Sequence, residues 1–326
     1  MQIPSKIKLT LIALISFFIA SFSVSAQYPE DDITVIIPYS AGGGFDSYVR
    51  GVLPAIQKHL PNSINLIPRN MPGAGGRKGA TAIFRARPDG YTIGAFNLPG
   101  LLLPHLLEEN VGYDLSEVSW LGRISEDRYS IVVASSSDIN SIDDLRALGR
   151  PILFTVTGVH SSAHAATMIT TNVLGLNARF ITGYEGSQNY VLAVVRGDGD
   201  VALGPSTSVR SYTETGDLKV IASLSDISPI EGVDTAADLG KPELAKLNVQ
   251  RMLGGPPNMN TQAHTILSNA LVQALVDPGL IEWSNSTGLP LAPLSATETE
   301  LNVASQWALY ENYKDKDGFL YIVYSA

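Results

Sequence analysis

Three consecutive glycines stand between a short apolar run and a helical pattern, and this arrangement suits anion binding. The segment VIIPYSAGGGFDSYVR places Gly42, Gly43 and Gly44 after β-branched residues and just before Asp46. Glycine accepts positive φ angles and lacks a Cβ atom, so a ligand can approach the backbone closely. The first N–H groups of a helix have no partner within it and carry the positive end of its dipole. The segment therefore predicts an anion-binding loop, although a tight turn without a ligand fits one such loop equally well.

A second glycine-rich segment, NMPGAGGRKGA, strengthens this prediction. Gly73, Gly75 and Gly76 follow another apolar run and precede another helical pattern. Loops at the carboxyl ends of two parallel strands can face one ligand, which is where open α/β sheets bind ligands. Neither loop has the residue spacing of a nucleotide-binding motif. The GDGDVA letters at 197–202 lie between a helical and a strand pattern, so we interpret them as a turn.

Residues suited to catalysis or metal binding do not form a recognised motif. The chain has no G-x-S-x-G segment, which a serine hydrolase would need. His160 and His164 have the spacing of two helical metal ligands, but no glutamate lies between them and no third ligand is evident. The chain has no cysteine, so a thiol nucleophile and disulfides are excluded. We therefore expect no catalytic residue, no metal and no cofactor, and an α/β hydrolase is the less favoured alternative.

The elements that must position these loops alternate between strands and helices. The first set predicts strands at 33–39, 64–68 and 91–96 and helices at 46–60 and 75–87, with Asp46 as the N-cap of the first helix. This order implies a parallel sheet with helices on both faces. A later set predicts strands at 129–136, 151–156, 200–205 and 219–225, with helices at 161–175 and 187–197. Two such sets predict an α/β protein with two lobes and a cleft between them.

The first 26 residues have the pattern of a secretory signal peptide. Lys6 and Lys8 precede the apolar segment 9–24, and VSA at 24–26 is a small-x-small cleavage site. A membrane anchor is the less favoured alternative, because the apolar run is shorter than the roughly 20 residues a spanning helix needs. We expect cleavage after Ala26 and export to a bacterial periplasm.

The charge of the chain excludes one class of partner and constrains another. The formal charge is −9, and removal of the signal peptide leaves 20 basic against 31 acidic residues. Nucleic acid requires a basic face, so we expect no nucleic-acid partner. An anionic ligand would have to be held by local dipoles against the overall negative field.

Three motifs together carry a family resemblance. PYSAGGGFDSYVR, NMPGAGG and RPDGYTI, in this order, resemble the substrate-binding receptors of tripartite tricarboxylate transporters, also called Bug receptors. Segments 158–166, 183–203 and 254–262 resemble the same family more weakly. The chain departs from the family pattern at Phe45, where a small residue is usual, and it lacks the usual tryptophan near Met252.

The resemblance implies a two-lobed periplasmic binding fold, each lobe a mostly parallel sheet flanked by helices, that closes on a small carboxylate or dicarboxylate. Lobe 1 would comprise 27–123 plus 252–326, and lobe 2 would comprise 124–251. The implied partners are the carboxylate ligand and the integral membrane subunits of the transporter, with the receptor itself a monomer. A receptor that senses the ligand for a signalling partner, or one that binds an uncharged ligand, remains an alternative.

The resemblance also implies the residues of the site. One carboxylate end would lie on the two glycine loops, at Tyr39, Ser40, Gly42, Gly43, Gly44, Gly73, Ala74, Gly75 and Gly76. Phe45 could add an aromatic wall. The distal end would meet Thr157, Ser161, Ser162, His164, Gly186, Ser187, Ser206 and Thr207. Plainer roles stay open: Ser161 and Ser162 as helix caps, and His164 as a partly buried core histidine.

Overall fold

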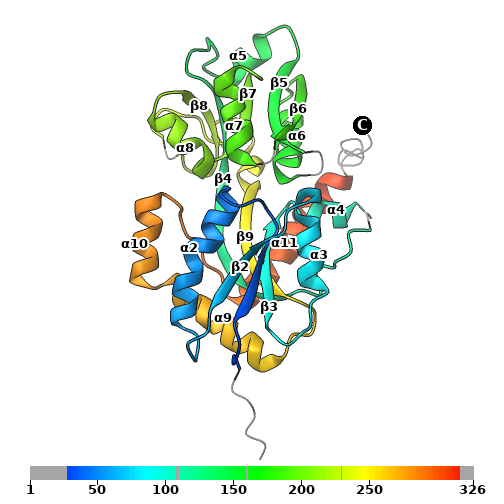
Figure 1. Ribbon diagram of the computed structural model, residues 1–326. Helices are drawn as coiled ribbons and strands as arrows, with labels where there is room; N and C mark the ends of the chain where they lie inside the picture. Colours follow the sequence, from blue (N-terminus) through cyan, green and yellow to red (C-terminus); the bar gives the residue numbers. More distant parts are fainter. Residues whose placement is uncertain (1–27, 108–109, 159–160, 185, 229, 316–326) are drawn as a thin grey trace, which may run out of the picture.

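Nine strands of the described residues form one continuous hydrogen-bonded sheet that runs through both parts of the molecule (Figure 1). The computed structural model describes residues 28–107, 110–158, 161–184, 186–228 and 230–315. The predicted signal peptide lies outside these residues, and so does His160. The strand order is β2-β1-β3-β9-β4-β7-β5-β6, and β8 pairs with β4.

The strands are β1 (Ile33–Ile37), β2 (Leu66–Asn70), β3 (Thr92–Leu98), β4 (Ser119–Ala134), β5 (Ile152–Thr157), β6 (Ala178–Tyr184), β7 (Val201–Pro205), β8 (Leu218–Leu224) and β9 (Asn248–Gly255). The helices are α2 (Gly44–Lys58), η1 (Ala74–Gly76), α3 (Arg77–Phe84), α4 (Leu102–Leu106), α5 (Ile142–Ala147), α6 (Ser162–Val173), α7 (Ser187–Arg196), α8 (Ser206–Glu214), η2 (Pro242–Lys246), α9 (Thr261–Leu275), α10 (Pro278–Thr287) and α11 (Ala296–Asp315).

Two strands, β4 and β9, connect the parts, which we call lobe 1 (around β1, β2 and β3) and lobe 2 (around β5 to β8). The first half of β4 pairs with β9 in antiparallel register, from Ser119 opposite Gly255 to Arg128 opposite Asn248. The second half, from Tyr129, pairs with β7 and β8. The predicted lobe boundaries at 123/124 and 251/252 fall within these two strands, and they stay a prediction.

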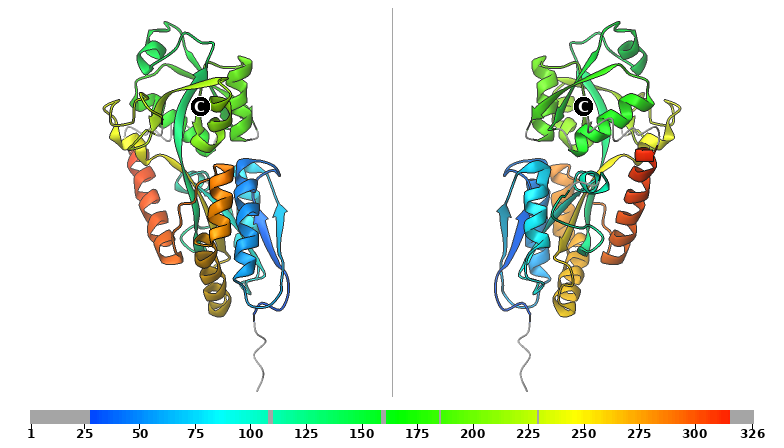
Figure 2. Two further views of the ribbon diagram at one scale, coloured as in Figure 1. Left: turned by 90° about the vertical axis from the view of Figure 1, so that its left-hand side faces the viewer. Right: turned by 90° about the vertical axis from the view of Figure 1, so that its right-hand side faces the viewer.

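Helices cover both faces of the lobe 1 sheet. On one face, β1 packs its apolar side chains against α2, α9 and α10, with Tyr48, Val52 and Ile56 of α2 buried at helical spacing. On the other face, α3, α4 and α11 belong to a core cluster that continues into lobe 2. Figure 2 shows α11 on the far side of β4 and β9 from α2 and α10. The predicted α/β class, with helices flanking the sheet, is confirmed.

The predicted elements cover part of the observed ones. Six strands, β1, β2, β3, β5, β7 and β8, each overlap a predicted strand. β2, β1 and β3 form one parallel group, and β6, β5 and β7 form another. The elements that were not predicted include β6, α4, α5, α8, α9, α10 and α11. β4 begins ten residues before its predicted start, and β9 was not predicted. Both strands carry buried polar side chains, among them Ser125, Asp127 and Arg251, which interrupt the apolar pattern. These crossing strands add the antiparallel pairings to otherwise parallel sheets.

Candidate functional site

The first glycine loop leaves the start of α2 without a side-chain cap among the described residues. β1 ends at Ile37, and Gly42 has a φ of 79° before the chain enters the helix. Gly43 is the N-cap, with extended backbone angles of −77° and 164°. A helix start without a side-chain cap keeps its first N–H groups available to a ligand.

Asp46 lies within the first turn of α2, so its prediction as the N-cap is wrong. Its carboxylate accepts hydrogen bonds from Gly42 N at 2.9 Å, Asn70 Nδ2 at 2.8 Å and Arg50 Nε at 2.8 Å. Burial raises the pKa of Asp46, but the hydrogen bonds from Gly42, Asn70 and Arg50 outweigh burial and lower it overall. Asp46 therefore holds the first loop against the end of β2. Because it accepts the hydrogen bond from Gly42 N, that N–H group is not available to a ligand.

The second glycine loop has four successive residues in positive-φ conformations. Gly73, Ala74, Gly75 and Gly76 have φ values of 136°, 48°, 65° and 97°. Gly76 is the N-cap of α3, which has no side-chain cap among the described residues. Within this turn Gly76 N and Lys78 N donate to Gly73 O at 3.0 and 3.4 Å, and Arg77 N donates to Ala74 O. Only glycine adopts these angles without strain at most positions, so the sequence pattern and the geometry agree.

Tyr39 brings the two glycine loops together. Its hydroxyl donates to Gly75 O at 3.4 Å, and a Cβ atom at Gly76 would lie 2.9 Å from the same hydroxyl. The ends of β1 and β2 are neighbours, since Ile37 pairs with Asn70. The pKa of Tyr39 is raised to about 12, chiefly by burial, so its hydroxyl is neutral and able to donate at physiological pH.

A chain of hydrogen bonds links these loops to lobe 2. Asn97, at the end of β3, donates through Nδ2 to Tyr39 Oη at 2.9 Å and to Ser162 Oγ at 3.2 Å. Ser161 is the N-cap of α6, where its hydroxyl accepts from His164 N at 3.1 Å and from the Thr157 hydroxyl. Ser161 is therefore a helix cap, and Ser162 is a buried contact to lobe 1.

The remaining predicted residues of lobe 2 lie at the starts of α7 and α8. Gly186 is the N-cap of α7 and offers no side-chain cap. Ser187 Oγ lies 2.7 Å from Ser208 Oγ, which joins the two helices. Ser206 donates to Arg128 O at 3.0 Å. Polar residues at the starts of α7 and α8 are thus in contact on the lobe 2 side.

His164 has the environment of a core residue. Its side chain is buried, and its ring lies edge-on to Phe180 with 5.3 Å between the ring centres. Such a ring contact is typical of packing inside a lobe. Its role as a ligand contact stays a prediction, and the role of a core histidine is consistent with this geometry.

Phe45 lies next to a buried ion pair, Arg251 and Asp127, that the sequence did not predict. Its ring centre is 4.7 Å from that of Tyr39 and 5.7 Å from the Arg251 guanidinium carbon. Arg251 Nη2 is 3.8 Å from Asp127 Oδ2, and both side chains are almost fully buried. The sequence signal that could have identified the pair is a charged residue inside each of two buried strands, Asp127 in β4 and Arg251 in β9.

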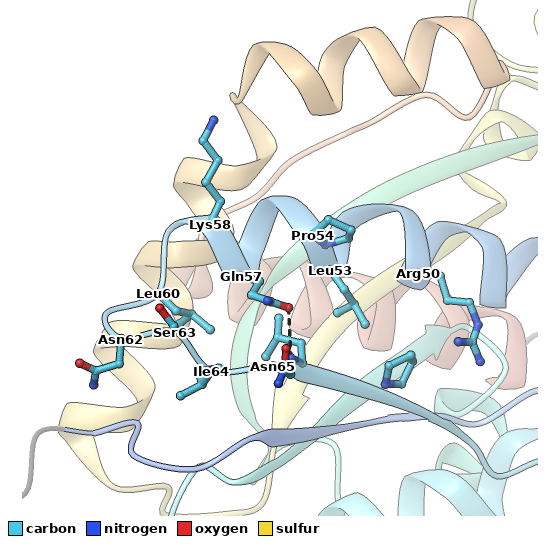
Figure 3. A pocket seen from close by; sticks show the side chains of 12 residues that line it. Arg50, Leu53, Pro54, Gln57, Lys58, Leu60, Asn62, Ser63, Ile64 and Asn65 are labelled. Atoms are coloured by element: carbon cyan, nitrogen blue, oxygen red, sulfur yellow. Dashed lines mark hydrogen bonds between the residues drawn. The ribbon is translucent and has the colours of Figure 1, made fainter.

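Two of the hollows at the surface of the described residues are lined by residues outside the glycine loops. One, of about 650 Å³, lies between α8 and the segment after α10 and is lined in part by Asp127, Ser206 and Thr207. The other, of about 690 Å³, lies between α2 and the edge strand β2 (Figure 3). In the hollow beside β2, Gln57 Oε1 accepts a hydrogen bond from Leu66 N at 3.4 Å, and Pro68 has no N–H group to donate. The outer edge of β2 therefore has few donors for another strand.

The described part of the chain offers no cluster of three His, Cys, Asp or Glu side chains that could hold a metal ion. Within the same residues, no helix is long and apolar enough to cross a membrane.

Comparison with known proteins identifies the family. The family model described as "Tripartite tricarboxylate transporter family receptor" matches residues 49–306. The chain belongs to this receptor family. The resemblance recognised in the three sequence motifs is therefore confirmed, and the chain is a solute-binding receptor of the tripartite tricarboxylate transporter type.

Two curated relatives match most of the chain. A UPF0065 protein from the ttuE-ttuC' intergenic region of Agrobacterium vitis is 27% identical over 284 residues, which cover 85% of this chain and 81% of the relative. The protein BugT of Bordetella pertussis is 26% identical over 303 residues, which cover 88% and 90% of the two chains.

Solved structures confirm the two-lobed periplasmic binding fold. The periplasmic binding protein BugD has a TM-score of 0.79 at 20% identity, covering 90% of this chain and 99% of its own. A Rhodopseudomonas palustris protein solved with adipate has a TM-score of 0.78 at 19% identity, covering 88% and 97%. MatC from the same organism, solved with malate, has a TM-score of 0.77 at 18% identity, covering 87% and 99%.

Proposed function

We propose that this receptor binds a small carboxylate or dicarboxylate between its lobes, with one carboxylate on the two glycine loops. The observation that carries the proposal is the start of α2, which follows the first glycine loop and has no side-chain cap among the described residues. Its first N–H groups favour a carboxylate through hydrogen bonding and the helix dipole. The second glycine loop lies beside this helix start, because Ile37 pairs with Asn70 and the Tyr39 hydroxyl donates to Gly75 O.

Relatives of the same fold support the class of ligand. Adipate and malate, named with two of the similar structures, are both dicarboxylates. A local seat built from N–H dipoles also suits a chain whose formal charge is negative, because such a chain offers no general attraction to anions.

Gly44 allows a direct test of the proposed seat. Gly44 is the first residue of α2, where proline is well accepted, and Gly43 before it is already extended. Gly44→Pro removes one N–H and keeps the helix, whereas Gly44→Ala keeps the N–H and meets no atom within 4 Å. Calorimetric titration with malate, adipate and other small carboxylates should show binding weakened about tenfold or more in Gly44→Pro relative to Gly44→Ala. Equal affinities in the two variants, or tighter binding of the corresponding neutral amides, would contradict the proposed seat.

We further propose that the chain is exported, is cleaved after Ala26, and delivers its ligand as a monomer to the integral membrane subunits of a tripartite transporter. The mass of the protein recovered from the periplasm tests the cleavage site, since the mature chain should begin at Gln27. Co-purification with the membrane subunits tests the partner. Recovery with a membrane kinase instead would favour the sensing alternative.

A further inference from the structure

Arg251 is a buried cation at the junction of the two lobes. It belongs to β9, which pairs with β3 on one side and β4 on the other, and its side chain is 4% exposed. The guanidinium carbon lies 4.2 Å from the ring centre of Tyr48 and 5.7 Å from that of Phe45, both on α2. Contact with these two rings keeps the guanidinium beside the start of α2, directly after the first glycine loop.

The guanidinium has more donors than the described residues accept. Nη1 donates to Ser125 Oγ at 3.2 Å. Nη2 lies 3.8 Å from Asp127 Oδ2, which is too long for a hydrogen bond, and the buried Nε has no hydrogen-bond partner among the described residues. Nε and Nη2 share one edge of the guanidinium, and such an edge donates two parallel hydrogen bonds to a carboxylate. This edge of Arg251 therefore lacks a close acceptor.

Asp127 does not supply that acceptor, because its oxygens are turned to lobe 2. Its carboxylate accepts from the Thr207 hydroxyl and from Thr207 N, at 3.4 Å for the latter, at the start of α8. Burial raises the pKa of Asp127, although Arg251 and the hydrogen bonds from Thr207 act in the opposite direction. A buried cation with one hydrogen bond and a loose ion pair is costly unless an anion completes its contacts.

We propose that the Nε–Nη2 edge of Arg251 binds a second carboxylate of the ligand, so that this receptor selects dicarboxylates over monocarboxylates. This inference rests on the proposed function, because it needs the first carboxylate to lie on the glycine loops. The first seat consists of neutral N–H groups and accepts any carboxylate. Arg251 adds a formal charge at a second point, where a ligand with a methyl end would leave the guanidinium without its partner.

The test compares dicarboxylates with monocarboxylates of the same chain length. The probes are the pairs adipate and hexanoate, malate and 3-hydroxybutyrate, and succinate and butyrate, titrated calorimetrically into the mature protein. In the wild type, at least one diacid should bind roughly 10- to 100-fold more tightly than its monoacid. In Arg251→Met both members of that pair should bind with the affinity of the monoacid, and Arg251→Lys should keep part of the preference.

The outcomes separate the two proposals. If Arg251→Met keeps the diacid preference, or if the wild type has none, the role of Arg251 is refuted while the glycine-loop seat stands. If the wild type binds no acid of either kind, the proposed function fails together with this inference. Removal of Arg251 alone leaves Asp127 as an unpaired buried charge and could prevent folding. In that case the double variant Asp127→Asn/Arg251→Met, which removes both charges, takes the place of Arg251→Met with the same expected result.

Discussion

The side-chain amide of Asn97 in lobe 1 donates to the hydroxyl of Ser162 in lobe 2 at 3.2 Å, from the same nitrogen that donates to Tyr39 at 2.9 Å. This pair joins the end of β3 to the first turn of α6 without passing through the crossing strands. The candidate site therefore has a direct polar connection between its two halves, and closure of the lobes can depend on it.

Ser162→Ala should weaken both closure and binding. The substitution removes the acceptor of Asn97 across the lobes, and a neutral hydrogen bond of this kind contributes about 1 kcal/mol. We expect carboxylate affinity to fall several-fold by calorimetry and the radius of gyration in solution scattering to increase. Ser268→Ala is the control, because Ser268 donates within α9 to Thr265 O. An unchanged affinity in Ser162→Ala would show that the Asn97 contact does not contribute to closure.

Asp46→Ala should destabilise the protein by about 2 kcal/mol, since it leaves the Gly42 and Asn70 donors without their buried acceptor. Its pKa is lowered in the folded state, so its contribution is complete above the unfolded pKa and is lost as the pH falls through the folded pKa. Urea unfolding of the wild type and the variant at neutral and acidic pH measures this. If the difference in unfolding free energy between the wild type and the variant does not shrink towards acidic pH, the charge of Asp46 does not contribute to stability.

Asp277→Asn should remove part of the dependence of stability on acidic pH. Asp277 is the N-cap of α10 and accepts from Lys58 Nζ at 2.6 Å and Gly279 N at 2.9 Å. These bonds, from Lys58 first, lower its pKa to about 2. The stability it contributes is therefore present above pH of about 4 and is lost as the pH falls towards 2. The melting temperatures of the variant and the wild type should therefore converge as the pH falls over this range. A difference in melting temperature that stays constant with pH would contradict the prediction.

Gly51→Ala should destabilise the packing of α2 on α10. A methyl group at this position would overlap the indole ring of Trp283. Overpacking of this kind typically costs about 1–3 kcal/mol, and Trp283→Leu in the same chain should recover part of it by making space. Gly158→Ala is the control, because an added Cβ there has no atom within 4 Å. Denaturant unfolding of the four proteins measures the costs, and a lack of recovery in the double variant would indicate a different cause.

Some features of this protein follow from local sequence alone. The glycine loops were predictable because positive φ angles at Gly42, Gly73, Gly75 and Gly76 are requirements of the local backbone, which glycine meets. The sequence pattern predicted the strands of the parallel groups except β6, together with helices α2, α3, α6 and α7, because their apolar residues repeat at regular spacing. The family followed from the same loops together with the RPDGYTI motif.

The crossing strands and the ion pair between them depended on tertiary structure. In β4 and β9, Asp127 and Arg251 are buried by partners far apart in the sequence, so a local pattern of apolar residues does not reveal the strands. The acceptors of Asp46, the contact from Asn97 to Ser162 and the loose pairing of Arg251 likewise join distant segments. The sequence by itself determined the backbone of the two loops and the class of fold. Which charged and polar side chains face one another between the lobes was decided only by folding, because their contacts are made across the sheet rather than along the chain.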